Sequence, residues 1–72
     1  MKLPKNITVT FEELDRSKED YLNDHYGFSD AVANYLSDTY GFCVFDFDYS
    51  ARKNSDGVLE AVVTNIHWDT SD

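Results

Sequence analysis

The sequence predicts an α+β fold in two layers: a three-stranded antiparallel sheet with one or two short helices packed on one face, in the order β-α-α-β-β. Three observations predict this fold. Residues near the N-terminus and in the C-terminal half alternate between apolar and polar, which is the period of a strand. The middle of the chain carries apolar residues at helical spacing. The length of 72 residues predicts a single domain, 1–72, with residues 69–72 as a frayed polar tail.

The first strand is predicted at Ile7-Thr8-Val9-Thr10-Phe11. Its residue types favour strands, and the alternation places Ile7, Val9 and Phe11 on one face. Pro4 lies just before this strand, where its missing N–H does little harm.

Two helices are predicted in the middle of the chain. Ser17 has the spacing of a capping box with Asp20, so a short first helix begins after Ser17, and Gly27 ends it. A second helix starts at Ser29 and Asp30, and Gly41 ends it. The apolar face of the second helix is formed by Val32, Tyr35, Leu36 and Tyr40.

The phrase YLNDHYGF, starting at Tyr21, recurs as YLSDTYGF, starting at Tyr35, with six of eight positions identical. We interpret the repeat as one helix stop signal used twice. In both copies the Tyr-Leu pair would face the core and the Asp would face water. The Gly would take the left-handed position after the helix, and the following Phe would pack against the helix end.

The last two strands are predicted to form a hairpin. In residues 42–49 the alternation gives one face with Cys43, Phe45, Phe47 and Tyr49, and another with Phe42, Val44, Asp46 and Asp48. A loop of turn-forming residues follows at 50–57. In the strand at 58–68, one face holds Val58, Glu60, Val62, Thr64, Ile66 and Trp68, and the other holds Leu59, Ala61, Val63, Asn65 and His67.

Net charge is the most informative property of the composition. Fourteen acids oppose six bases, which gives a formal charge of −8, and the 33 residues between Lys18 and Arg52 contain seven acids and no base. This charge repels nucleic acid and anionic membranes and attracts basic surfaces. The alternative interpretation is that the charge only keeps a small domain soluble. No apolar run reaches the length of a membrane span or a signal peptide, and Cys43 is the single cysteine, so we expect a cytoplasmic location.

The sequence contains no evident grouping of catalytic or metal-binding residues. We therefore expect a protein that is not an enzyme and has no cofactor or metal. Asp46 and Asp48 resemble a carboxylate pair, but an EF-hand loop counted from Asp46 would need Gly and Glu where the chain has Ala51 and Gly57. The soft ligands lack the paired spacing of zinc sites. They are His25, Cys43 and His67, and we expect Cys43 to be a small core residue.

The candidate partner-binding residues are acidic side chains expected at the surface and one tyrosine beside them. They are Asp20, Asp24, Asp30, Asp38, Asp46, Asp48 and Tyr35. Tyrosines next to acids provide contact area at low entropic cost. The expected partner is a basic protein surface, that of a nuclease or another nucleic-acid-binding protein, without direct contact to nucleic acid or membrane. The alternative is a structural or assembly module that self-associates, as a homodimer, through a sheet edge or an aromatic patch.

The run NYLSDTYGFCV, from Asn34 to Val44, resembles a segment of small proteins from phages and mobile elements of Gram-positive bacteria. In size and charge the chain is also similar in type to phage inhibitors, among them anti-CRISPR and anti-restriction proteins. The resemblance implies an inhibitor in the cytoplasm of a bacterial host that presents carboxylates in place of phosphates. No functional residue carries over from it.

Overall fold

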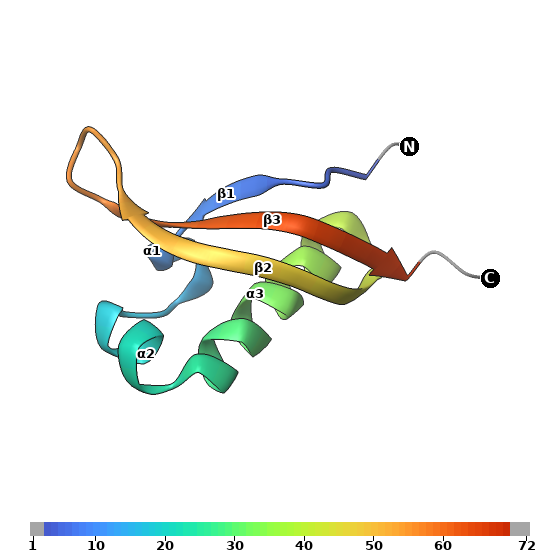
Figure 1. The fold of residues 1–72 in the computed structure, drawn as a ribbon, viewed down its shortest axis with the longest axis horizontal. Coiled ribbons are helices and arrows are strands. Elements are labelled where there is room, and N and C mark those ends of the chain that lie inside the picture. The colour runs from blue at the N-terminus through green and yellow to red at the C-terminus, as the bar shows by residue number, and fades with distance from the viewer. Residues whose placement is uncertain (1–2, 70–72) are drawn as a thin grey trace.

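The computed structural model describes residues 3–69 and confirms the predicted α+β fold with the order β-α-α-β-β (Figure 1). One additional single-turn helix follows the first strand. The elements are β1 (Ile7–Thr10), α1 (Phe11–Leu14), α2 (Lys18–Asn23), α3 (His25–Tyr40), β2 (Cys43–Lys53) and β3 (Leu59–Asp69). Within residues 3–69, no helix is long and apolar enough to cross a membrane.

The sheet is antiparallel throughout, with the strand order β1-β3-β2, so β3 is central and β2 lies at one edge. The register aligns Val9, Ala61 and Ala51 across the three strands, all facing α3. Alternate residues, such as Thr8, Val62 and Ser50, lie on the opposite face, which none of the described helices covers.

The core lies between α3 and the inner face of the sheet. Its buried residues are Val9, Phe11, Leu14, Phe28, Val32, Leu36, Ala61, Val63 and Ile66. Phe28 is fully buried, and its ring lies 5.0 Å from that of Phe11, 5.1 Å from that of Tyr21 and 5.3 Å from that of Tyr49. This one ring therefore joins α1, α2 and β2 to α3. Burial raises the pKa of Tyr49, the charge of Tyr21 adds to this, and the Tyr49 hydroxyl donates to the His25 carbonyl.

The predicted boundary between the two helices is wrong. The interpretation that one stop signal is used twice is therefore also wrong. The first helix ends at Asn23, and Asp24 is both its C-cap and the N-cap of α3. The Asp24 carboxylate accepts the Gly27 N–H at 3.0 Å, so Gly27 lies in the first turn of α3. Of the two glycines in the repeated phrase, only Gly41 has the left-handed conformation of a helix stop, with φ of 79°. A capping carboxylate satisfies free amides at a helix start, and this outweighs the glycine signal.

The two copies of the repeated phrase consequently have different environments. Leu36 is fully buried, but Leu22 is 57% exposed, so the predicted core position of the Tyr-Leu pair fails in the first copy. Phe28 enters the core from inside α3, whereas Phe42 follows the end of α3 and is 40% exposed. Sequence identity does not produce structural equivalence here, because the first copy spans the boundary between α2 and α3, whereas the second copy lies at the C-terminal end of α3.

The first strand is one residue shorter than predicted, because Phe11 begins α1. The Thr10 hydroxyl accepts the Glu13 N–H at 3.2 Å and caps this turn. Phe11 is still buried beside Val9, as the alternation predicts. Asp15 then takes the left-handed conformation, with φ of 56°, and turns the chain toward α2.

Two irregularities in the hairpin change which residues face the core. Val44 pairs with Trp68 and Asp46 with His67, so β2 has one extra residue between them. Asp48 pairs with Thr64, so β3 has the next extra residue, where Asn65 has a left-handed φ of 52°. The predicted faces of both strands are therefore wrong along part of their length.

On β2 the residues packed against the core are Val44, Phe47, Tyr49 and Ala51, while Cys43 and Phe45 are exposed. On β3 they are Leu59, Ala61, Val63, Ile66 and Trp68. A strict period of two cannot survive an inserted residue, because each insertion moves the following side chains to the other face.

The ends of the hairpin strands also differ from the prediction. The predicted loop begins at Ser50, but β2 continues to Lys53, and the turn is closed by Asn54, whose side chain accepts the N–H groups of Asp56 and Val58. Asp69, expected in the frayed tail, is the last residue of β3. The remainder of that predicted tail, residues 70–72, lies outside the described residues.

We expect Phe28→Ala to destabilise the fold by about 3–5 kcal/mol, because it removes the ring that joins four elements and leaves a cavity. A domain of this length has a total stability of roughly 4–11 kcal/mol, so Phe28→Leu is the safer companion variant. The measurement is urea unfolding followed by circular dichroism. Tyr26→Ala is the control, because Tyr26 is 92% exposed, and it should change stability by less than about 0.5 kcal/mol. Equal effects of Phe28→Ala and Tyr26→Ala would contradict this packing.

Two glycine substitutions should separate the two copies of the repeated phrase. Gly41→Ala should cost about 1–2 kcal/mol because of the left-handed φ. Gly27→Ala should also destabilise, but for another reason: the new Cβ would collide with the Asp24 carboxylate. In an Asp24→Ala background the collision is gone, so Gly27→Ala should become stabilising by up to about 1 kcal/mol. In the same Asp24→Ala background, Gly41→Ala should still destabilise the fold by about 1–2 kcal/mol. A double-mutant cycle in urea tests this, and additive effects of Gly27→Ala and Asp24→Ala would refute it.

Candidate functional site

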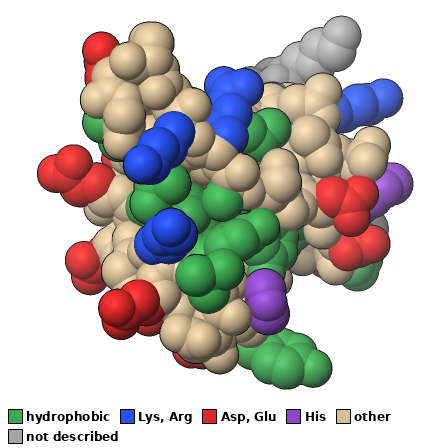
Figure 2. Space-filling model, turned by 60° about the vertical axis from the view of Figure 1, so that its left-hand side comes forward, with side chains coloured by type: hydrophobic (Ala, Val, Ile, Leu, Met, Phe, Trp, Pro, Cys, Tyr) green, Lys and Arg blue, Asp and Glu red, His purple; other side chains and the backbone are tan. Residues whose placement is uncertain are grey.

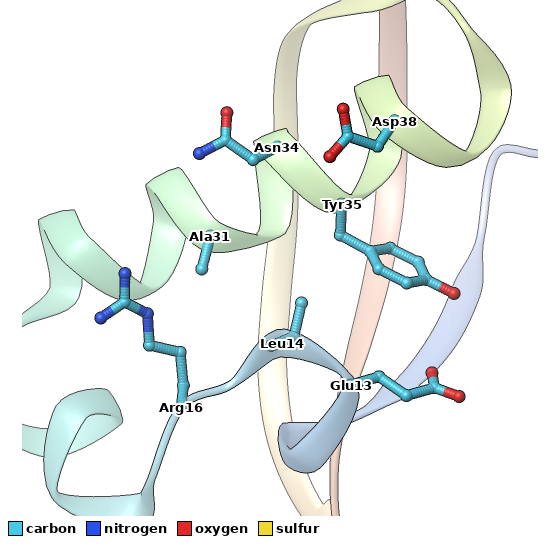
Figure 3. Close-up of a pocket in the computed structure, with 7 residues that line it drawn as sticks. All are labelled: Glu13, Leu14, Arg16, Ala31, Asn34, Tyr35 and Asp38. Carbon is cyan, nitrogen blue, oxygen red and sulfur yellow. The ribbon is translucent and has the colours of Figure 1, made fainter.

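An open groove of about 270 Å³ lies between α1 and α3 (Figure 3). It contains both acidic and apolar side chains, one cation, one amide and one phenol. The lining residues are Glu13, Leu14, Arg16, Ala31, Asn34, Tyr35 and Asp38. The groove therefore brings together two of the residues predicted for partner binding, Tyr35 and Asp38, with residues from a helix that was not predicted.

The α3 side of the groove follows from helical periodicity. Ala31, Asn34, Tyr35 and Asp38 are spaced at i, i+3, i+4 and i+7, which places them in one stripe. This stripe is adjacent to the buried stripe of Phe28, Val32 and Leu36. Tyr35 is thus half-buried at the margin of the core.

The α1 side of the groove depends on the short turn that follows β1. Leu14 is buried against the core, and Glu13, one residue earlier, is exposed. The left-handed Asp15 reverses the chain, and the Arg16 N–H donates to the Phe11 carbonyl at 3.0 Å. In Figure 3 the Arg16 guanidinium extends toward α3 at one end of the groove, and the Glu13 carboxylate and Tyr35 hydroxyl point to the other end.

Arg16 has an unusual environment for a charged side chain. Its Nε atom is buried and has no hydrogen-bond partner among residues 3–69. A buried donor without an acceptor is costly, so this part of the Arg16 side chain is held in the groove wall at a desolvation cost. The groove thus has the Arg16 guanidinium at one end, the Glu13 carboxylate at the other, and the Asp38 carboxylate on its α3 wall.

The remaining predicted residues lie outside the groove. Asp30 is on the exposed side of α3 and accepts the Asn34 amide at 3.5 Å, so it is close to the groove through Asn34. Asp20 and Asp24 are helix caps. Asp46 accepts the Phe47 N–H at 2.9 Å, and Asp48 accepts the Asn65 amide at 3.0 Å, both on the hairpin. In Figure 2 acidic side chains lie on opposite sides of the face shown, so the acids do not form one patch.

The structure places the acidic charge mainly in the helical layer. Residues 11–40 contain eight acids and two bases, a net charge of −6 out of −8 for the whole chain. On the face shown in Figure 2, Lys and Arg side chains lie around an area of hydrophobic side chains. The molecule therefore has surfaces of differing charge instead of a uniform acidic surface.

Potential metal ligands do not converge in the described part of the chain. Within residues 3–69 no three His, Cys, Asp or Glu side chains are placed to hold a metal ion. Cys43 is exposed at the start of β2, which corrects the expectation that it is a core residue. Cys43 lies outside the core because the extra residue in β2 places Val44 on the inner face in its stead.

Glu13, Leu14 and Arg16 were not among the predicted site residues, although the sequence contains a signal for them. Thr10 is followed three residues later by Glu13, which is the spacing of a capping box and marks a helix start. Recognising that signal would have placed Glu13 in a helical turn directly after the first strand.

Comparisons with protein-family models, with curated proteins and with solved structures found no match to this chain.

The cap at Asp20 should make stability depend on pH. The Ser17 backbone N–H, followed by the Ser17 hydroxyl, donates to this carboxylate and holds the pKa of Asp20 below its ordinary value. A lowered pKa stabilises the fold above about pH 4, and this contribution is lost as the pH falls through the folded-state pKa. Asp20→Asn should therefore be less stable than the natural protein at pH 7, and the difference should shrink below about pH 4.

Urea unfolding at several pH values measures this effect. Ser17→Ala is the matched variant, because it removes the hydroxyl donor and keeps the backbone donor, so it should lose only part of the pH dependence. A difference between Asp20→Asn and the natural protein that stays constant from pH 7 to pH 2 would show that the carboxylate has no such role.

Proposed function

We propose that the protein is a non-enzymatic acidic binding protein whose helical layer occupies a basic surface of a partner protein. The observation that carries this proposal is the groove between α1 and α3, where Glu13, Tyr35 and Asp38 surround one hollow (Figure 3). These groups can accept hydrogen bonds from Lys or Arg side chains, and the net charge of −6 in residues 11–40 attracts a basic partner.

The groove suits a long basic side chain better than a simple ion. Leu14 and Ala31 provide apolar contact for the aliphatic part of such a side chain, and Glu13 and Asp38 each provide a carboxylate, one from each wall, for its charged end. Arg16 repels a second cation at its own end, and its guanidinium, which lines the groove, would donate to a carbonyl of the partner backbone. The groove therefore favours one basic residue within a polypeptide over a free cation.

Nucleic-acid-binding proteins are the partner class with the most suitable surfaces, since they present Lys and Arg to phosphate groups. On such a surface the carboxylates of Asp30, Asp38 and Glu13 would take the place of phosphates and block access of the nucleic acid. The protein would then act as an inhibitor of the phage type. Association would be fast and sensitive to salt, because long-range attraction between opposite charges accelerates encounter.

The test starts with a pull-down from bacterial lysate with tagged protein, washed at low and then at high salt, followed by mass spectrometry. The binding constant of the captured protein is then measured with purified components. Asp38→Lys should weaken binding by about 30-fold or more, which corresponds to about 2 kcal/mol. Tyr35→Ala should also weaken binding, with a smaller change in salt dependence. Double-stranded DNA should compete with the natural protein for the partner.

Asp56→Lys is the matched control, because it makes the same charge change on the exposed hairpin loop, away from the groove. It should retain most of the affinity. Equal losses for Asp38→Lys and Asp56→Lys would mean that net charge alone determines binding, and the groove would have no specific role. Binding that does not respond to salt or to competing DNA would refute the proposal of a nucleic-acid-binding partner.

A further inference from the structure

β2 leaves a long edge of the sheet without a neighbouring strand. It has 11 residues, and β3 pairs with only one of its sides. The opposite edge of the sheet is formed by β1, which has four residues. Within residues 3–69, no backbone group outside the hairpin bonds to the outer side of β2. An open strand edge of this length is a template for pairing with another strand.

The side chains of β2 are arranged so that the strand is complementary to itself in the antiparallel direction. On the outer face, acids precede bases: Asp46 and Asp48 come first, Ser50 follows, and Arg52 comes last. On the inner face, large residues precede a small one: Phe47 and Tyr49 are followed by Ala51. When a second copy of this strand pairs in the antiparallel direction, acidic residues lie opposite basic residues on the outer face. Large side chains lie opposite small side chains on the inner face.

We propose that two copies of this chain form a homodimer by antiparallel pairing of their β2 strands, centred on Tyr49. In this register Asp46 lies opposite Arg52 of the second copy, and by symmetry the pair forms twice. Phe47 lies opposite Ala51 of the second copy, and the two Tyr49 residues face each other. Directly opposite side chains on one face are about 4.5–5.5 Å apart at Cβ, which is within reach of an ion pair and of packing contacts.

Neighbouring registers are less favourable for stated reasons. Pairing centred on Asp48 would place two aspartates directly opposite each other, which repels. Pairing centred on Ser50 would place Phe47 opposite Lys53 and Asp46 opposite Asn54 in the loop. Only the register centred on Tyr49 matches Asp46 with Arg52 and Phe47 with Ala51 at the same time.

The charged groups that this dimer needs, Asp46 and Arg52, are exposed. The Arg52 side chain is 58% exposed, and its contact with Glu60, at 3.2 Å, uses only Nε of a guanidinium group with five donors. Phe45 is 73% exposed at the end of the strand. In the proposed register it lies near Lys53 of the second copy, whose aliphatic chain would cover the ring.

The two-fold axis would stand perpendicular to the sheet, so a continuous six-stranded sheet would form with the helices of both copies on the same face. The groove between α1 and α3 contacts neither strand of the new pairing, because its lining residues all come from residues 13–38. The dimer is thus independent of the function proposed above, and each can fail without the other.

The test is a charge swap measured by sedimentation over a range of protein concentrations. The natural protein should show a dimer that dissociates on dilution. Asp46→Arg and Arg52→Asp should each raise the dissociation constant by tenfold or more, because each places like charges opposite each other twice. A mixture of the two variants should dimerise again, because each chain then supplies the charge that the other needs. The double variant with both substitutions should dimerise by itself.

Circular dichroism and urea unfolding should confirm that each variant is folded. Glu12→Arg and Lys5→Asp are the matched controls, since they make the same charge changes at exposed positions away from β2, and they should dimerise like the natural protein. A natural protein that stays monomeric at all concentrations would overturn the proposal. So would a dimer that the charge swaps leave unchanged, or folded single variants that fail to associate when mixed.

Discussion

The packing of Phe28 is the constraint on which the rest of the structure depends. Its fully buried ring contacts rings from α1, α2 and β2, so one side chain lies at the centre of the aromatic cluster that connects these elements to α3. α2 has no buried residue, so Tyr21 is its main connection to the core through Phe28 and Phe11. A domain this small buries a modest share of its surface, so one large aromatic side chain in the right place has a large effect on stability.

The position of Phe28 depends in turn on a local competition that the sequence alone does not decide. Gly27 and Asp24 are both boundary residues: a glycine favours a helix end, and an aspartate favours a helix start. The carboxylate prevails because its bond to the Gly27 N–H begins α3 early enough to direct Phe28 into the core. The Ser17 capping box was predictable because its two residues bond each other locally. The Asp24 cap was not predictable in this way, because it also depends on where the ring of Phe28 is buried.

The hairpin shows a second limit of reasoning from sequence. The existence, order and direction of its strands follow from alternation and from the turn residues. Which face meets the core does not, because one extra residue in β2 and another in β3, at Asn65, shift the alternation. A period of two contains no information about insertions, so the inward positions of Val44 and Ile66 are visible only when the strands are paired. The same shift moves Phe45 and Cys43 out of the core.

The helix caps and the extra residues in the strands also determine how the charge is distributed over the surface. Of the candidate acids, Asp20 and Asp24 serve as helix caps, Asp30 and Asp38 lie on α3, and Asp46 and Asp48 lie on the outer face of β2. Sequence reasoning could name the acids, but their division among separate surfaces results from the fold. A single acidic patch would imply one partner for all of them. The two proposed surfaces, one acidic beside a groove and one self-complementary along a strand, lie on different elements, so the proposed basic partner and a second copy of the chain would not compete.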